Sequence, residues 1–479
     1  MILRVINHPY EFDTKNLCIT FFPHEKIRLE GEEDPVVVTT RRETDGSFFV
    51  SAKVYDVYRE TTAKPEPADE EHLVLSVTLY RLLSGILGFA PPWGVLYGVR
   101  PAKLMHRLCA QMGDDAAVAH FQTAFLTQKS KAELAHEVML HENRSIARSG
   151  PKSFSLYVSI PFCPTRCAYC SFVSHSIEKT HKLMTPYVDL LLRELEETAK
   201  YAKELGLELA TVYFGGGTPT TLSAQDLGRI FSTIEQNFDL SHLMEYTVEA
   251  GRPDTVTRER LEVIRAAGVQ RISINPQSFN DKVLEAIGRR HTAQQTLDAF
   301  ALARDCGFDH INMDFIAGLP EDDLPSFQRS IQTALDLQAE SITVHTLALK
   351  TSAYMVTREQ TFDLKDRLTV SNMVDYAGQS LHGAGYYPYY MYRQSKSLGN
   401  LENVGWCKPG YDCLYNVYMM DETHTVLAVG AGAVTKLRGQ NSGMIERIYN
   451  YKYPYEYIRD FDTLLERKKR IPGFYAEYD

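Results

Sequence analysis

Residues 157–172 read YVSIPFCPTRCAYCSF, and this stretch decides how the rest of the chain is interpreted. It carries Cys163, Cys167 and Cys170 in a C-x3-C-x2-C pattern, directly after an apolar run that predicts a strand. Three thiolates on one tight loop can each bind a different iron of a [4Fe–4S] cluster, which leaves the fourth iron open. S-adenosyl-L-methionine (AdoMet) can chelate that iron, and its reduction releases a 5′-deoxyadenosyl radical that abstracts hydrogen from carbon.

Two other interpretations of the three cysteines are open. A structural zinc site would take a fourth ligand such as His175, and three buried thiols would take none. Zinc sites more often pair two short cysteine or histidine motifs, and no second half is visible in the sequence. The other five cysteines are scattered singly, which does not indicate a disulfide framework; they are Cys18, Cys109, Cys306, Cys407 and Cys413.

Short apolar runs alternate with amphipathic stretches from residue 151 to about residue 350. The six strand candidates are Ser155–Ile160, Thr211–Phe214, Tyr246–Ala250, Arg271–Asn275, Ile311–Ile316 and Ser341–His345. Strands separated by helical stretches predict an α/β fold, with a parallel sheet covered by helices. Because there are six units rather than eight, we expect an open, partial (β/α)6 barrel.

The regions on either side of this barrel have their own patterns. Residues 1–60 predict a β-rich piece with strands at Leu17–Phe22, Pro35–Thr40 and Phe48–Val54. Residues 61–150 begin with a proline- and acid-rich linker, 61–71, and continue with helical spacing. Residues 351–479 predict a helix at about Arg367–Gly383, then a tyrosine-rich run and a hairpin that ends near Lys436.

Composition narrows the possible partners. The net charge of −10 and the pI near 5.9 give no electrostatic footprint for nucleic acid or an anionic membrane. The longest apolar stretches are far shorter than a membrane span, and the first residues lack the layout of a signal peptide. We therefore expect a cytoplasmic protein that acts on a small molecule.

Two further features suggest where AdoMet binds. The run FGGGTPT, residues 214–220, follows the second strand of the series, and glycines without Cβ atoms let the backbone approach a ligand closely. A lone glycine run is usually only a turn, but Gly216 stands beside the cysteine loop and could receive the AdoMet amino group. Glu249 ends the third strand, where a carboxylate could bind a ribose diol or an ammonium, or could simply be a solvated acid.

Taken together, a set of motifs resembles the oxygen-independent coproporphyrinogen III oxidase superfamily of radical SAM enzymes, and its HemZ-like branch most of all. The motifs are IPFCPTRCAYCSF (160–172), FGGGTPT (214–220), VEAGRPD (248–254), RISINPQSFN (271–280), IGRRHT (287–292), NMDFIAGLP (312–320) and GAGAVTK (430–436). Segments 93–104, 389–394 and 398–406 also match that branch. The resemblance implies a radical SAM partial barrel over 151–350, a HemN-like C-terminal domain over 351–479 and an N-terminal α+β extension.

The resemblance also implies site residues. Contacts to the cluster-bound AdoMet would come from Tyr157, Gly216, Glu249 and Val434. Members that hold a second AdoMet would use Tyr169, Gly217, Thr218, Gln277, Arg289, Asp314 and Ala348. The implied partners are a tetrapyrrole substrate and an electron donor such as flavodoxin or ferredoxin.

One departure from the family pattern keeps several functions open. The classical oxidase has a further cysteine two positions after the third cluster ligand, whereas this chain has Ser171 and Phe172 there. The haem-chaperone relatives share that absence. The candidates are therefore oxidative decarboxylation of coproporphyrinogen III to protoporphyrinogen IX, haem binding by a chaperone of the HemW type, and methyl transfer by a radical SAM methyltransferase.

The tyrosine-rich run suggests a wall of the substrate site. Tyrosines 386, 387, 389, 390 and 392 precede Arg393. Aromatic faces could stack on a flat macrocycle, and an arginine fork could hold a propionate. Alternating tyrosines on a strand also commonly pack a sheet, and this plainer interpretation is the favoured one.

Overall fold

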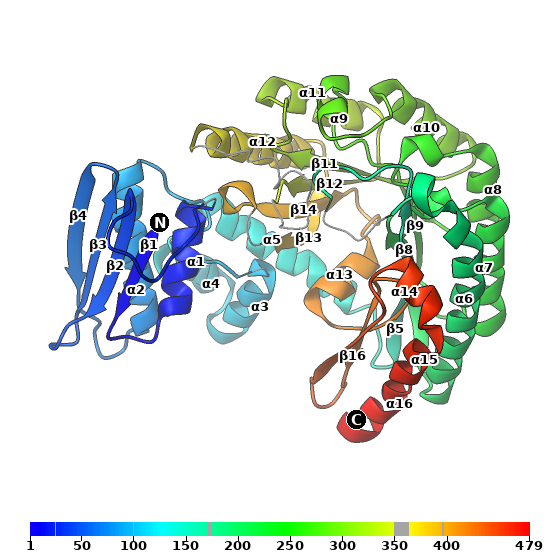
Figure 1. Cartoon of the computed structure of the whole chain (residues 1–479), viewed down its shortest axis with the longest axis horizontal. Coiled ribbons are helices and arrows are strands. Elements are labelled where there is room, and N and C mark those ends of the chain that lie inside the picture. Colours follow the sequence, from blue (N-terminus) through cyan, green and yellow to red (C-terminus); the bar gives the residue numbers. More distant parts are fainter. Residues whose placement is uncertain (24, 99, 171–174, 349–363, 395–396) are drawn as a thin grey trace.

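A mixed sheet of eleven strands forms the centre of the molecule, and a separate sheet of four strands lies at its N-terminal end (Figure 1). The structure is a computed structural model that describes residues 1–23, 25–98, 100–170, 175–348, 364–394 and 397–479. The strand order in the large sheet is β13-β14-β12-β11-β10-β9-β8-β5-β15-β16-β17. In the described part of the chain, no helix is long and apolar enough to cross a membrane.

Six neighbouring parallel strands form the partial barrel, as the sequence predicts. They are β5 (Ser153–Ile160), β8 (Glu208–Gly216), β9 (Glu245–Glu249), β10 (Arg271–Ser273), β11 (His310–Ala317) and β12 (Ser341–Thr346). The helices that follow these strands cover the outer face as a continuous arc (Figure 1). They are α6 (Ile177–Glu204), α7 (Ala224–Asn237), α8 (Arg258–Ala266), α9 (Asp281–Ala286), α10 (Ala293–Asp305) and α11 (Leu324–Asp336).

Local sequence fixes where these covering helices begin. Five of them start with a side-chain oxygen that accepts a backbone N–H of the first turn, which satisfies an otherwise unpaired donor. The capping residues are Ser223, Thr257, Asn280, Thr292 and Asp323. Each strand therefore ends in a loop of defined length, and these loops surround the carboxyl end of the barrel.

The C-terminal region extends the barrel sheet at both of its edges. On one side β14 (Glu402–Cys407) pairs antiparallel with β12, and β13 (Tyr387–Arg393) pairs with β14. On the other side β15 (Thr425–Val429) pairs parallel with β5, followed by the antiparallel strands β16 (Val434–Arg438) and β17 (Ile445–Tyr449). The helices of this region are α12 (Leu364–Gly383), α13 (Leu414–Asp421), α14 (Pro454–Arg459), α15 (Phe461–Lys468) and α16 (Arg470–Tyr478).

The N-terminal piece is a sheet with two helices rather than strands alone. Its strands are β1 (Ile2–Ile6), β2 (Val36–Arg42), β3 (Phe48–Val54) and β4 (Val57–Ala63), and its helices are α1 (Glu11–Phe21) and α2 (Glu71–Leu87). The predicted strand at Leu17–Phe22 is therefore wrong, because those residues complete α1. The helix buries Thr14, Leu17, Cys18 and Phe21, a three- and four-residue spacing that outweighs the β-branched composition.

Three helices connect this piece to the barrel: α3 (Pro101–Met112), α4 (Asp114–Thr123) and α5 (Lys129–Ile146). Helix α5 packs on β13. A buried polar network joins the two regions, in which Lys131 Nζ lies 2.7 Å from Glu402 Oε1 and 2.8 Å from Asp375 Oδ1. The Trp93 indole donates to the other oxygen of Glu402 over 2.7 Å.

Candidate active site

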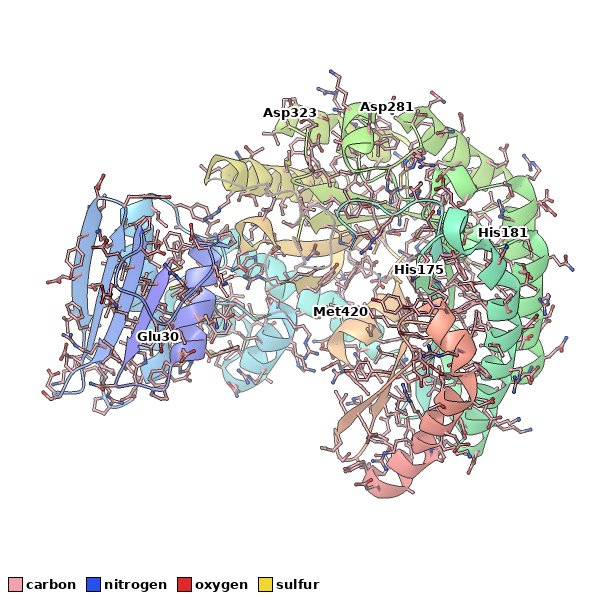
Figure 2. All side chains as sticks on the ribbon, viewed as in Figure 1. Glu30, His175, His181, Asp281, Asp323 and Met420 are labelled. Atoms are coloured by element: carbon pink, nitrogen blue, oxygen red, sulfur yellow. The ribbon has the colours of Figure 1, made fainter. Side chains whose placement is uncertain are left out.

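A cavity of about 410 Å³ opens at the carboxyl ends of the barrel strands. Its lining includes twelve of the fourteen residues that the sequence proposes for cofactors. These are Cys163, Cys167, Tyr169, Cys170, Gly216, Gly217, Thr218, Glu249, Gln277, Arg289, Asp314 and Ala348. Figure 2 places Met420, which also lines the cavity, towards the centre of the molecule, whereas Asp281 and Asp323 lie at its outer edge.

The cysteine loop is held against the end of β8 by backbone bonds. The N–H of Gly217 donates to the Ile160 carbonyl over 2.7 Å, and the N–H of Thr218 donates to the Phe162 carbonyl over 2.7 Å. A Cβ at Gly217 would lie 2.6 Å from the Phe162 oxygen, so only glycine allows this approach. The sequence interpretation had the backbone of this glycine run approach a ligand; the structure shows that the N–H groups of Gly217 and Thr218 bond within the protein itself.

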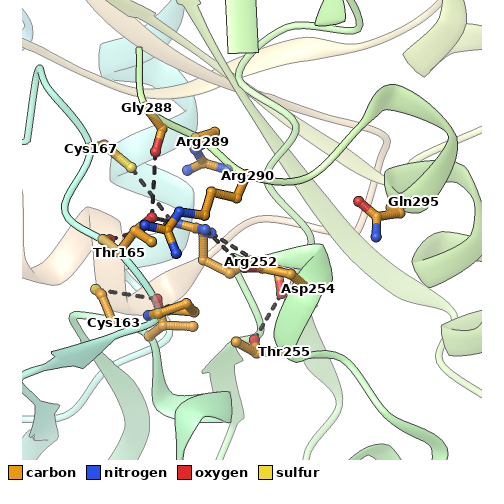
Figure 3. A network of polar contacts seen from close by, with 12 residues as sticks. Cys163, Thr165, Cys167, Arg252, Asp254, Thr255, Gly288, Arg289, Arg290 and Gln295 are labelled. Carbon is orange, nitrogen blue, oxygen red and sulfur yellow. Dashed lines mark hydrogen bonds and ion pairs between the residues drawn. The ribbon is translucent and has the colours of Figure 1, made fainter. Parts of the chain in front are cut away.

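Two buried arginines also contact this loop, Arg252 through Thr165 and Arg289 through Tyr169 (Figure 3). Arg252 forms a two-pronged ion pair with Asp254, at 2.9 Å for each bond, and its Nη1 donates to Cys167 Sγ over 3.7 Å. Arg289 donates to the Asn275 carbonyl over 2.6 Å and to the Tyr169 hydroxyl over 3.2 Å. Positive charge beside these sulfurs suits ligands that bind iron as thiolates.

The sulfur atoms of the three cysteines are not gathered as a single zinc ion would gather them. The sulfur atoms of Cys163, Cys167 and Cys170 do not all lie within 4.8 Å of one another. One tetrahedral zinc would draw them to separations of about 3.8 Å, given Zn–S bonds of about 2.3 Å. His175 is not part of the cavity lining; its ring packs instead edge-on against Tyr453, with ring centres 5.7 Å apart. Three thiols on one loop, each able to bind a different iron, therefore fit a cubane.

Two carboxylates of the cavity differ in their charge state. Burial raises the pKa of Glu249 to about 7, although the Tyr213 hydroxyl donates to its Oε1 over 2.6 Å. Burial also acts to raise the pKa of Asp314, but the His345 ring and the Asn312 amide, which donates over 2.7 Å, hold it below its ordinary value. Near neutral pH Asp314 is charged, while Glu249 can gain or lose a proton.

Two predicted residues lie outside the cavity lining. The ring of Tyr157 on β5 stacks on the ring of Tyr213, with centres 6.3 Å apart, and on the ring of Tyr415, with centres 6.0 Å apart. Val434 begins β16, directly after the loop 430–433. A hydrogen bond to the buried Glu194 side chain holds this loop, because the N–H of Gly430 donates to its Oε2 over 2.7 Å.

Part of the tyrosine-rich run lines the cavity, as expected for a wall of the substrate site, and part of it packs within the protein. Tyr390 and Tyr392 line the cavity, and their rings stack with centres 6.3 Å apart. Arg393 does not hold a ligand there, because it is 3% exposed and donates to the carbonyls of Leu96 and Asn400 over 2.8 and 3.1 Å. The structural role that the sequence favoured for this arginine is confirmed.

Sequence reasoning missed two cationic residues of the site. Arg252 lay inside the motif VEAGRPD, and Arg271 opened the motif RISINPQSFN, but neither was singled out. For Arg271 the available signal was an arginine at the start of a predicted barrel strand, because such a charge is rarely buried without a partner or a ligand.

Comparison with known proteins supports the site and the fold. A family model described as the Radical SAM superfamily matches residues 157–334. The oxygen-independent coproporphyrinogen-III oxidase-like protein HemZ of Bacillus subtilis is 34% identical over 95% of this chain and 94% of its own length. The heme chaperone HemW of Escherichia coli is 30% identical over 63% of this chain and 74% of its own length.

Among solved structures, the coproporphyrinogen III oxidase HemN from Escherichia coli has the same fold. The match has a TM-score of 0.50 and 21% identity, and it covers 68% of this chain and 72% of that one. The radical SAM superfamily uses a [4Fe–4S] cluster and AdoMet, so these are the cofactors of this protein. The chain belongs to the HemZ-like group of the radical SAM coproporphyrinogen oxidase family.

Proposed function

We propose that this protein oxidatively decarboxylates coproporphyrinogen III to protoporphyrinogen IX. The observation that carries the proposal is a single cavity that joins the three cysteines, on one side, to the aromatic faces of Tyr390 and Tyr392 on the other. Flat aromatic faces suit a planar ring system, and the volume lies in the range of small-molecule sites. Similarity to an oxidase-like protein along nearly the whole chain supports the same assignment.

The chain's own residues have definite tasks in this proposal. Cys163, Cys167 and Cys170 hold the cluster, while Gly216 and Glu249 receive AdoMet. In each reaction a propionate loses carbon dioxide, one hydrogen atom and one electron; the hydrogen atom passes to the radical that AdoMet would supply, and the electron passes to an external one-electron acceptor. The buried position of Glu249 keeps water away from the bonds it makes, which strengthens them.

A second ligand position is proposed beside the first. The Oε1 atom of Gln277 and the Nε atom of Arg289 are buried at the cavity without a hydrogen-bond partner among the described residues. Gln277 also has a φ of 65°, a strained value that surrounding structure must enforce. A second AdoMet, with hydrogen-bonding groups at both ends, would satisfy these atoms.

Anaerobic incubation of cluster-loaded protein with AdoMet, a reductant and coproporphyrinogen III tests the assignment. We expect protoporphyrinogen IX together with 5′-deoxyadenosine, and neither from a variant in which the three cysteines are alanine. Formation of 5′-deoxyadenosine with the porphyrinogen unchanged would reject the oxidase.

Haem binding by a chaperone is the second candidate. Its support is the similarity to heme chaperones at about 30% identity and the absence of the additional cysteine after Cys170. A Soret band that saturates at one haem per chain, in protein that leaves coproporphyrinogen III untouched, would favour it. Transfer of a methyl group from AdoMet to an added substrate would instead favour a methyltransferase.

A further inference from the structure

Arg271 is a buried cation whose hydrogen-bonding groups the protein leaves unmet. It is 1% exposed and lines the cavity, and its Nε and Nη1 atoms have no hydrogen-bond partner among the described residues. In the part of the chain that the structure describes, no carboxylate lies within 4.0 Å of it. Arginine stays charged in proteins, and an unpaired charge of this kind is strongly destabilising.

The other buried arginines of this region show the contrast. Arg252 is matched by Asp254, and Arg289 donates to the carbonyl of Asn275 and the hydroxyl of Tyr169. Glu245 is the carboxylate that shares the interior with Arg271, but its oxygens accept backbone N–H groups, from Leu414 over 2.5 Å among others. Glu245 therefore offsets the charge of Arg271 without satisfying its donors.

Depth in the barrel limits what can reach Arg271. The residue opens β10, and Ser273, two positions later, is paired in register with Glu249 at the rim. At about 3.3 Å of rise per residue, Arg271 lies about 6–7 Å below Glu249 along the strand direction. This offset is between backbone positions; since the Arg271 side chain is buried and lines the cavity, a narrow, extended group that hangs from a larger body at the rim fits the approach to it.

We propose that Arg271 binds a carboxylate of the substrate, carried on a flexible arm of the propionate type. A guanidinium binds carboxylates through charged hydrogen bonds, and the N–H groups of Nε and Nη1, which lie on different edges of the guanidinium, are each open to such a bond. This inference rests on the proposed function, because a porphyrinogen ring at the level of Tyr390 would direct one of its propionates down to the floor of the cavity. It assigns to Arg271 the role that the sequence had suggested for Arg393.

Two ligands that differ only at the carboxylates test the proposal. Coproporphyrin III and its tetramethyl ester are titrated against wild-type protein and the variants Arg271→Gln and Arg271→Lys, with binding followed by the Soret band. We expect wild-type protein to prefer the free acid by about ten- to hundred-fold, the loss that follows removal of a charged hydrogen bond. Arg271→Gln should abolish the preference, and Arg271→Lys should restore part of it.

The ester serves as the internal control for folding, since its affinity should be equal in all the proteins. Arg258→Gln provides a matched exposed arginine on α8, 54% exposed, and should keep the wild-type preference. A preference for the acid that survives in Arg271→Gln overturns the role of Arg271 and leaves the oxidase assignment intact.

Wild-type protein that binds neither porphyrin would count against the tetrapyrrole assignment instead. The carboxylate site is then judged with sodium propionate against sodium chloride at equal ionic strength. A melting temperature raised by propionate in wild-type protein but not in Arg271→Gln supports the site. An equal response in both proteins overturns it.

Discussion

The strand edge at β13 and β14 and the cavity around β10 both bury charged side chains, but they supply partners to different degrees. At the edge Lys131 meets two carboxylates, and Arg393 meets backbone carbonyls. In the cavity Arg271 leaves both Nε and Nη1 without a partner among the described residues, whereas Arg393 at the edge leaves only Nε. The difference teaches that tyrosines and arginines in one motif can serve stability or binding, and that a place in the cavity lining distinguishes the two.

The largest effect is expected from removal of the three cysteines that hold the cluster. Changing Cys163, Cys167 and Cys170 to alanine should abolish iron and sulfide binding completely, because each cysteine supplies one corner ligand. Iron analysis and the visible spectrum measure this. Cys306→Ala is the matched control, since Cys306 lies on the outer helical layer beside Arg258. Iron retained in the triple variant would show that the cluster lies elsewhere.

The next effect concerns the contact between β8 and the cysteine loop. Gly217→Ala should lower the iron content severalfold, because its Cβ would lie 2.6 Å from the Phe162 oxygen and force the loop away. Gly228→Ala on α7 is the control, where the new Cβ would meet Val263 at an ordinary 3.7 Å. Equal iron content in both variants would contradict the proposed clamping of the loop.

At the strand edge of β13 and β14, substitution should lower the stability of the fold and leave cofactor binding unchanged. Lys131→Met leaves Glu402 buried without its cation and should lower the free energy of unfolding by about 3–5 kcal/mol. Lys200→Met breaks the exposed pair with Glu197, which solvent screens, and should cost far less stability. Denaturant unfolding compares the two. If Lys131→Met impaired AdoMet binding at unchanged stability, the separation between edge and rim would fail.

Glu249 should give the smallest effect and the one that depends on pH. Because burial raises its pKa to about 7, the carboxylate that accepts hydrogen bonds from AdoMet is lost as the pH falls through 7. AdoMet affinity should therefore rise between pH 6 and pH 8. In Glu249→Gln it should be about ten-fold weaker and independent of pH. Calorimetric titration across this range measures both, and a parallel pH dependence in the variant would assign the titration to another group.

The barrel and the cysteine loop were predictable because their signals are local. Six strands follow from short apolar runs, and Cys163, Cys167 and Cys170 lie within eight residues. The pairing of β14 with β12 and of β15 with β5 was not predictable, because nothing in either strand's sequence specifies a partner that is distant along the chain. Long-range packing also decided the roles of the arginines, since a motif does not reveal which donors find partners.

Mössbauer spectroscopy of the ⁵⁷Fe-loaded protein, with and without AdoMet, tests the central claim most directly. Three cysteine ligands leave one iron of the cluster open to AdoMet. We predict that about a quarter of the iron signal shifts on AdoMet addition, and that Glu249→Gln requires more AdoMet for the same shift. An iron signal that AdoMet leaves unchanged at saturating concentration, with all four irons alike, would contradict the account.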